Sequence, residues 1–188
     1  MRFEFFDPER EAEALARFDE LTGGALKSRP VQRRVRTNVA TATTERWAAA
    51  WSSGDANTCA ALLSDTLTYI DHPTHIEYGR DETDATTRAA LRSQEPRARH
   101  EILATQGESL ALWRRWLSAS GTSGRFFDVA EYEREELVVS DGDEQGRMRR
   151  AEVFAAAKLG DALMRVYERC AELLPEGPAR TRAEATAR

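Results

Sequence analysis

The sequence predicts an α+β domain in which a cone-shaped, curved and mostly antiparallel sheet wraps around three helices, with an N-terminal strand-helix arm and a C-terminal helix. Three observations predict this fold. Apolar residues recur at helical spacing before Pro96, a period of two replaces that spacing afterwards, and turn sequences separate the later segments. Short turns join consecutive strands as hairpins, so we expect most neighbouring strands to be antiparallel.

The elements are expected in a definite order. A helix begins at Thr37 or Asn38, and a short second helix begins after Asp55, because these polar side chains can cap a helix N-terminus. A strand at 66–72 follows, and Asp81 then caps a third helix. The remaining chain is predicted to form four strands and a last helix, at 99–105, 109–118, 125–139, 147–155 and 160–174.

The chain is expected to divide into three parts: an arm and basic linker at 1–36, the main domain at 37–176, and a flexible tail at 177–188. The first and last strand-helix pairs align without a gap, and Glu4 then matches Glu152. Two interpretations stay open. The match is chance similarity between two amphipathic helices, or the arm is the tail of a preceding copy of the domain.

Composition and charge exclude several classes of function. The net charge of −5 argues against a nucleic-acid surface, which needs clustered excess Lys and Arg. No apolar run approaches the roughly twenty residues of a membrane span, the N-terminus lacks the pattern of a secretory signal, and two cysteines are too few for a disulfide scaffold. We therefore expect a cytoplasmic protein that binds neither nucleic acid nor membranes.

Titratable side chains are concentrated in one stretch, residues 66–81. Asp71 shares a strand face with Tyr69 and is expected to point into the cone, where desolvation would raise its pKa towards the range of a general base. The alternative, an aspartate that caps the turn at Pro73, stays open. His72 is expected on the opposite face, at the surface or the cavity rim, unless a bulge reverses the strand end.

Five short motifs carry a resemblance to a known family: Trp47, Gly54-Asp55, Leu62-Leu63-Ser64-Asp65, Tyr69-Ile70-Asp71-His72-Pro73 and Tyr78-Gly79-Arg80-Asp81. In this order they resemble the nuclear transport factor 2-like superfamily, which includes SnoaL-like polyketide cyclases, ketosteroid isomerases and limonene epoxide hydrolases. The resemblance covers roughly residues 38–158. It implies a conical apolar cavity, with no cofactor and no metal, in a fold that hosts enzymes and binding modules alike.

The ketosteroid isomerase pattern places an Arg-Tyr pair in the first helix and a catalytic Asp directly before a Pro. Here Arg46 and Trp47 occupy the first motif, and His72 precedes Pro73. Both catalytic residue types are replaced, so the resemblance does not imply steroid isomerisation itself.

The epoxide hydrolase pattern fits other residues. Tyr69 and Asp71 match its Tyr-x-Asn-x-Pro strand end, Glu152 matches an acid on the last strand, and Arg114 matches an arginine on a central strand. Trp116 stands where that pattern has its general acid. The resemblance therefore implies that Tyr69, Asp71, Arg114 and Glu152 converge on one cavity.

Together these inferences predict a small acid/base enzyme, an isomerase, cyclase or hydrolase, that acts on an apolar oxygenated small molecule, most simply as a homodimer. Asp71 takes a proton, with His72 as the fallback, and Tyr69 orients substrate or water. Arg114 and Glu152 stabilise or protonate the developing oxyanion. The expected substrate-binding residues are Trp47, Trp51 and Trp116. The alternative is a non-catalytic ligand-binding or oligomerisation module derived from a longer multi-repeat protein.

Overall fold

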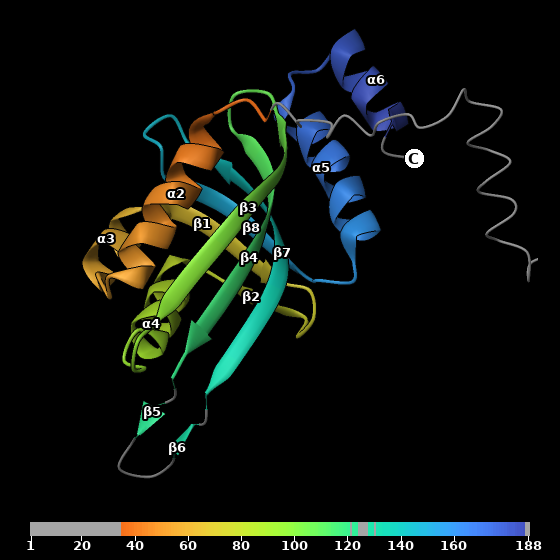
Figure 1. Cartoon of the computed structure of the whole chain (residues 1–188). Helices are drawn as coiled ribbons and strands as arrows, with labels where there is room; N and C mark the ends of the chain where they lie inside the picture. The colour runs from red at the N-terminus through yellow and green to blue at the C-terminus, as the bar shows by residue number, and fades with distance from the viewer. Residues whose placement is uncertain (1–34, 121, 124–127, 130, 187–188) are drawn as a thin grey trace, which may run out of the picture. The chain divides into compact units, whose positions relative to one another are not determined.

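A computed structural model describes residues 35–120, 122–123, 128–129 and 131–186 (Figure 1). The predicted N-terminal arm and nearly all of its linker lie outside these residues. The predicted α+β class is confirmed, because the described part combines a six-stranded sheet with five helices. The helices are α2 (Val39–Ser52), α3 (Ala56–Ala61), α4 (Arg80–Ala90), α5 (Leu159–Leu173) and α6 (Pro178–Thr186).

The large sheet is mixed and mostly antiparallel. Its strands are β1 (Leu63–Asp71), β2 (Ile76–Tyr78), β3 (Arg97–Gln106), β4 (Leu110–Ala119), β7 (Tyr132–Gly142) and β8 (Met148–Ala155). They lie in the order β2-β1-β8-β7-β4-β3, and among these pairs β1 with β8 is parallel. A separate small pair consists of β5 (Thr122–Ser123) and β6 (Asp128–Val129). The long β4–β7–β8 meander was predicted, whereas β2 was not.

The sheet has a hydrophobic core on each face. On the inner face, Trp47 and Trp51 of α2 pack with Trp113 of β4 and Val138 of β7. On the outer face, α5 packs onto a second cluster that includes its own Val166. Helices α2 and α5 therefore cover opposite faces of the sheet (Figure 1).

The cap of α2 fixes this helix to the sheet. The Asn38 side chain accepts a hydrogen bond from the Thr41 backbone N–H at 3.0 Å. Its amide donates to the carbonyls of Gly107 and Leu110, at the turn between β3 and β4. Because one buried residue caps the helix and bonds the hairpin, the tryptophans of α2 are held at a fixed place against the inner face.

Two local expectations are corrected. Helix α4 is capped by Gly79, whose N–H donates to Glu82 Oε2 at 3.1 Å, so Asp81 lies inside the helix. Strand β1 begins at Leu63, three residues before the strand expected at 66–72. In the C-terminal segment, helix α6 packs against α5.

Candidate active site

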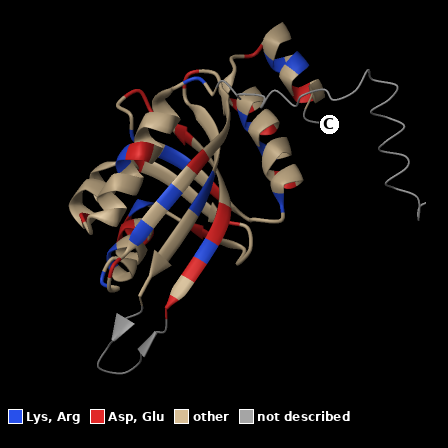
Figure 2. Ribbon diagram, viewed as in Figure 1, with Lys and Arg blue, Asp and Glu red and all other residues tan. Residues whose placement is uncertain are grey.

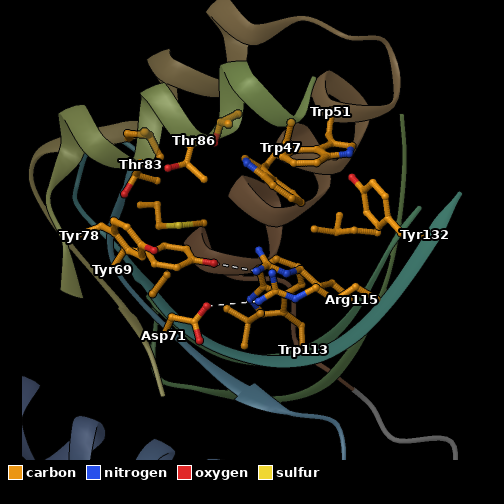
Figure 3. A pocket seen from close by; sticks show the side chains of 18 residues that line it. Trp47, Trp51, Tyr69, Asp71, Tyr78, Thr83, Thr86, Trp113, Arg115 and Tyr132 are labelled. Carbon is orange, nitrogen blue, oxygen red and sulfur yellow. Dashed lines mark hydrogen bonds and ion pairs between the residues drawn. The ribbon is translucent and has the colours of Figure 1, made fainter. Parts of the chain in front are cut away.

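A cavity of about 340 Å³ lies between the inner face of the sheet and helices α2 and α4 (Figure 3). Its walls are mainly apolar and aromatic, and its polar lining includes Tyr69, Asp71, Arg115 and Arg134. Cavities of several hundred cubic ångströms with few polar groups are typical of small-molecule sites. The cavity is therefore the strongest candidate for a functional site in the described part of the chain.

The centre of the site is a hydrogen bond between Tyr69 on β1 and Arg115 on β4. Arg115 Nη2 donates to the phenolic oxygen of Tyr69 at 2.7 Å (Figure 3). The oxygen accepts in this bond, so the phenolic O–H is left free to donate to another group. A guanidinium beside the oxygen makes the phenol a stronger donor, because it stabilises negative charge there.

Arg115 is buried, with only 5% of its surface exposed, and Glu136 on β7 balances its charge. Arg115 Nε donates to Glu136 Oε2 at 2.6 Å, in a direct cross-strand pair. Burial acts against the charged form of Arg115, but Tyr69 and Glu136 outweigh it and raise its pKa. The guanidinium is therefore a fixed positive charge behind the phenol at any physiological pH.

Asp71 lies beside this pair and is also buried. Its Oδ2 accepts from Arg134 Nη2 at 3.3 Å, and its Oδ1 accepts from the backbone N–H of Thr74 at 3.2 Å. The same Arg134 nitrogen contacts Glu136. Half of the Arg134 side chain is exposed, so this guanidinium can move away without leaving the surface. The site thus holds two carboxylates and two guanidinium groups.

Aromatic rings line the cavity beside Arg115. The ring centroids of Trp47 and Trp51 lie 5.0 Å apart, and Trp113 meets Trp47 edge-on at 6.1 Å. Trp113 Nε1 donates to Ser140 Oγ at 3.0 Å, which fixes its ring. Arg115 lies 5.7 Å from the Trp47 ring centroid, so the rings also stabilise its charge. This wall suits a flat apolar ligand.

Four of the residues predicted for the site line the cavity: Tyr69, Asp71, Trp47 and Trp51. Their contributions to binding and catalysis stay predictions. The sequence reasoning overlooked Arg115 and Glu136. The signal for Arg115 was available, since it shares one face of its strand with the apolar residues Trp113 and Leu117.

The expectation that Arg114 and Trp116 line the cavity is wrong. Both point to the outer face, because Trp113 and Arg115 take the inward positions of β4 and side chains alternate along a strand. Arg114 Nε lies 3.5 Å from Glu135 Oε1, and Trp116 is stacked against Arg99. Neither side chain forms an ion pair or a ring contact with a residue that lines the cavity.

Glu152 also lies on the outer face, which corrects its expected place in the cavity. His72 lies there too, on the face opposite Asp71 as expected, so the fallback in which a bulge turns it into the cavity does not apply. His72 Nε2 lies 3.0 Å from Glu152 Oε2, and its ring stacks on Phe154. Glu152 also accepts from Arg150 and Arg165. Burial opposes the charged form of Glu152, but these hydrogen bonds lower its pKa. Since Tyr69 and Asp71 face inward, the residue after Asp71 faces outward.

No family model and no curated protein matches the chain. Solved structures do. A Δ5-3-ketosteroid isomerase from Mycobacterium sp. aligns with a TM-score of 0.52 and 12% identity over 64% of this chain and 95% of that chain. A provisionally assigned polyketide cyclase from Xanthomonas campestris pv. campestris aligns with a TM-score of 0.51 and 15% identity, over 64% of this chain and 92% of that chain. A computationally designed 17-OHP binder aligns with a TM-score of 0.52 and 10% identity, over 63% of this chain and 92% of that chain.

The chain has the nuclear transport factor 2-like fold. The family resemblance in its sequence is confirmed at this level, and at such identities the likeness extends to the fold alone. Two further observations concern the described residues only. No group of three or more His, Cys, Asp or Glu side chains is placed to hold a metal ion, and no helix is long and apolar enough to cross a membrane.

Proposed function

We propose that this nuclear transport factor 2-like chain binds an apolar small molecule through an oxygen atom and performs acid/base chemistry on it. The reaction is an isomerisation, a cyclisation or an addition of water. The observation that carries the proposal is the Tyr69–Arg115 hydrogen bond inside an apolar cavity. It creates a polarised O–H donor where a ligand oxygen would develop negative charge.

Tyr69 acts as the oxygen-binding group. Its phenolic proton donates to a carbonyl or hydroxyl oxygen of the ligand, and the bond strengthens as that oxygen gains charge. Arg115 does not contact the ligand in this scheme but stabilises the phenol from behind. Glu136 holds Arg115 in place, so it is a positioning residue. One such donor is commonly worth about 10²–10³ in rate.

Asp71 acts as the base. Its carboxylate takes a proton from a carbon next to the ligand oxygen, or from a water molecule, when Arg134 moves away from Oδ2. The exposed position of Arg134 supports this movement, and Glu136 can keep its second contact to Arg134 meanwhile. A cyclase or an isomerase needs such a pair of groups, one to remove a proton and one to hold the oxyanion.

The alternative is a module that binds such a ligand without reaction. One observation favours it: Asp71 is already paired with Arg134, so its carboxylate must leave this partner before it can reach a ligand. A computationally designed 17-OHP binder of similar fold supports this alternative. The two candidates share the cavity and differ in the role of Asp71. For either one we propose a reducing, cytoplasmic setting, which suits the free thiols Cys59 and Cys170.

Proton exchange on a simple ketone separates the candidates. The probe is 1-tetralone, a bicyclic ketone whose α-protons exchange with D₂O, followed by NMR while binding is followed by tryptophan fluorescence. The enzyme proposal expects faster exchange with wild type, a loss of about 10²-fold or more in Asp71→Asn, and about 10²-fold in Tyr69→Phe. Asp81→Asn and Tyr167→Phe, which change exposed side chains away from the cavity, are the matched controls.

Each outcome decides between the proposals. Binding without accelerated exchange would favour the binding module and refute the base assigned to Asp71. Exchange that survives in Asp71→Asn would refute it equally. The cavity is not the functional site if 1-tetralone neither binds nor exchanges its protons, and if Trp47→Ala leaves binding and exchange as they are in wild type.

A further inference from the structure

The charged side chains that line the cavity differ in their exposure. Asp71 and Arg115 are buried, whereas half of the Arg134 side chain is exposed. Tyr78 and Tyr132 also line the cavity without being buried, and Figure 3 shows them on opposite sides of it. The lining that reaches solvent, here called the cavity mouth, therefore includes these two tyrosines and Arg134. Among the described residues that line the cavity, Arg134 is the charged one at this mouth.

The contacts of Arg134 with the described residues run through a single nitrogen. Its Nη2 donates to Asp71 Oδ2 at 3.3 Å and also contacts Glu136 Oε1. A guanidinium has five N–H donors in a planar fork, so Nε and Nη1 keep donors for a further partner. The contact with Asp71 is long compared with the 2.6 Å bond that Arg115 donates to Glu136. It is therefore the contact that a competing group displaces most easily.

The acidic residues next to Arg134 in the sequence do not surround it at the cavity. Figure 2 shows acidic positions on both sides of a basic one near the start of β7. Side chains alternate along a strand, so Glu133 and Glu135 face the outer side of the sheet, where Glu135 pairs with Arg114. A negatively charged group of a ligand can thus approach Arg134 from the cavity mouth without meeting these two acids.

We propose that the ligand of this cavity carries a carboxylate, which Arg134 binds at the cavity mouth while the apolar body of the ligand lies against the tryptophans. The inference rests on the proposed function, which supplies the second oxygen, the one that Tyr69 binds. The ligand is then a cyclic or aromatic keto acid. A planar guanidinium fits a carboxylate through two parallel hydrogen bonds, and one carboxylate matches the single charge of Arg134.

Such a ligand explains how Asp71 is released for chemistry. The base assigned to Asp71 requires Arg134 to move away from Oδ2, and a carboxylate at the mouth gives Arg134 a partner on the solvent side. Glu136 stays neutralised during this movement, because Arg115 donates to its other oxygen, Oε2. A ligand without a carboxylate leaves Asp71 paired. Arg134 is therefore a specificity-determining residue that links the charge of the ligand to the availability of the base.

Matched pairs of ligands test the proposal. The probes are carboxylic acids of 1-tetralone that differ in the aromatic ring position of the carboxylate, each compared with its neutral methyl ester. Calorimetric titration gives both dissociation constants, and the ratio of ester to acid is the measured preference. Arg134 is half exposed, so its charged hydrogen bond lies at the lower end of the usual range, and the best acid should bind about tenfold more tightly than its ester. Added salt should reduce this preference.

Substitutions assign the preference to Arg134. In Arg134→Gln the ratio should fall to about one, and Arg134→Lys, which keeps the charge but loses the fork, should give an intermediate ratio. The matched control is Arg88→Gln, because Arg88 is an arginine of α4 that pairs with Asp84 and does not line the cavity. It removes the same charge and should keep the wild-type ratio. Circular dichroism melting shows whether each variant folds.

Two results would overturn the proposal. The first is a wild-type chain to which no acid binds more tightly than its ester. The second is a folded Arg134→Gln variant that keeps the preference for the acid. Exchange of α-protons in D₂O separates this proposal from the proposed chemistry. A preference for the acid without accelerated exchange would keep the ligand class and refute the base, whereas accelerated exchange without a preference would keep the base and refute the carboxylate.

Discussion

Replacing Arg115 by methionine tests whether the buried charge pair holds the cavity together. The substitution keeps an unbranched side chain but leaves Glu136 buried without its 2.6 Å partner. Breaking a buried ion pair costs about 3–5 kcal/mol. Arg134 still contacts Glu136, so we expect a loss at the lower end, about 3 kcal/mol in the free energy of unfolding.

Urea unfolding, monitored by tryptophan fluorescence, measures this loss. The matched control is Arg88→Met, because Arg88 makes an equally direct ion pair with Asp84 at 3.0 Å but on an exposed helix surface. Such surface pairs contribute roughly 0–1 kcal/mol. The double variant Arg115→Met with Glu136→Met removes both charges, and we expect it to be more stable than the sum of the single losses by about 1–2 kcal/mol.

The reasoning is refuted if Arg115→Met costs no more than Arg88→Met. It is equally refuted if the two single losses add without coupling. Either result would mean that water or other side chains satisfy Glu136 in the variant. The rigid placement of Tyr69 would then lose its physical basis.

Three further results are expected. A hydrogen bond from Arg165 lowers the pKa of Glu172 from 4.5 to about 2. Because the folded pKa lies below the unfolded one, this contribution to stability is complete above pH 4.5 and disappears as the pH falls towards 2, so Glu172→Gln should flatten that part of a urea-stability profile against pH. Burial raises the pKa of Cys59 to about 11, so at pH 8 its reaction with a disulfide reagent should wait for unfolding. A Cβ added at Gly142 would meet Val39 Cγ1 at 2.7 Å, so Gly142→Ala should cost about 1–3 kcal/mol in thermal unfolding. The additional change Val39→Ala should relieve that clash, and an unchanged loss would refute this cause.

Much of the fold could be predicted because local signals determine it. The segment at 99–105 lies between Pro96 and the turn at Gln106-Gly107, and it became β3 with two residues more at its start and one more at its end. Strand β2 was missed because three residues carry no period. The parallel pairing of β1 with β8 was also beyond reach: it joins residues about 80 positions apart, such as Tyr69 and Ala151, and no local pattern encodes such a register.

The site was predictable only where alternation alone decides it. Tyr69 and Asp71 share a face with the buried Leu67, so their direction follows from the strand period. On β4 the same rule left two choices, Trp113 with Arg115 or Arg114 with Trp116. A family motif suggested the second choice. The first one is correct because Glu136, on a strand distant in sequence, neutralises Arg115 inside the core.

The neighbours Asp71 and His72 show how one strand end serves two separate networks. Asp71 turns inward to Arg134 and the cavity, and His72 turns outward to Glu152 and the anchor of α5. A substitution at His72 therefore acts first on the attachment of α5, whereas one at Asp71 acts on the cavity. Because Glu152 also binds Arg165 of α5, the outward network couples the end of β1 to that helix. The attachment of α5 and the cavity can thus be altered one at a time, by changing adjacent residues of a single strand.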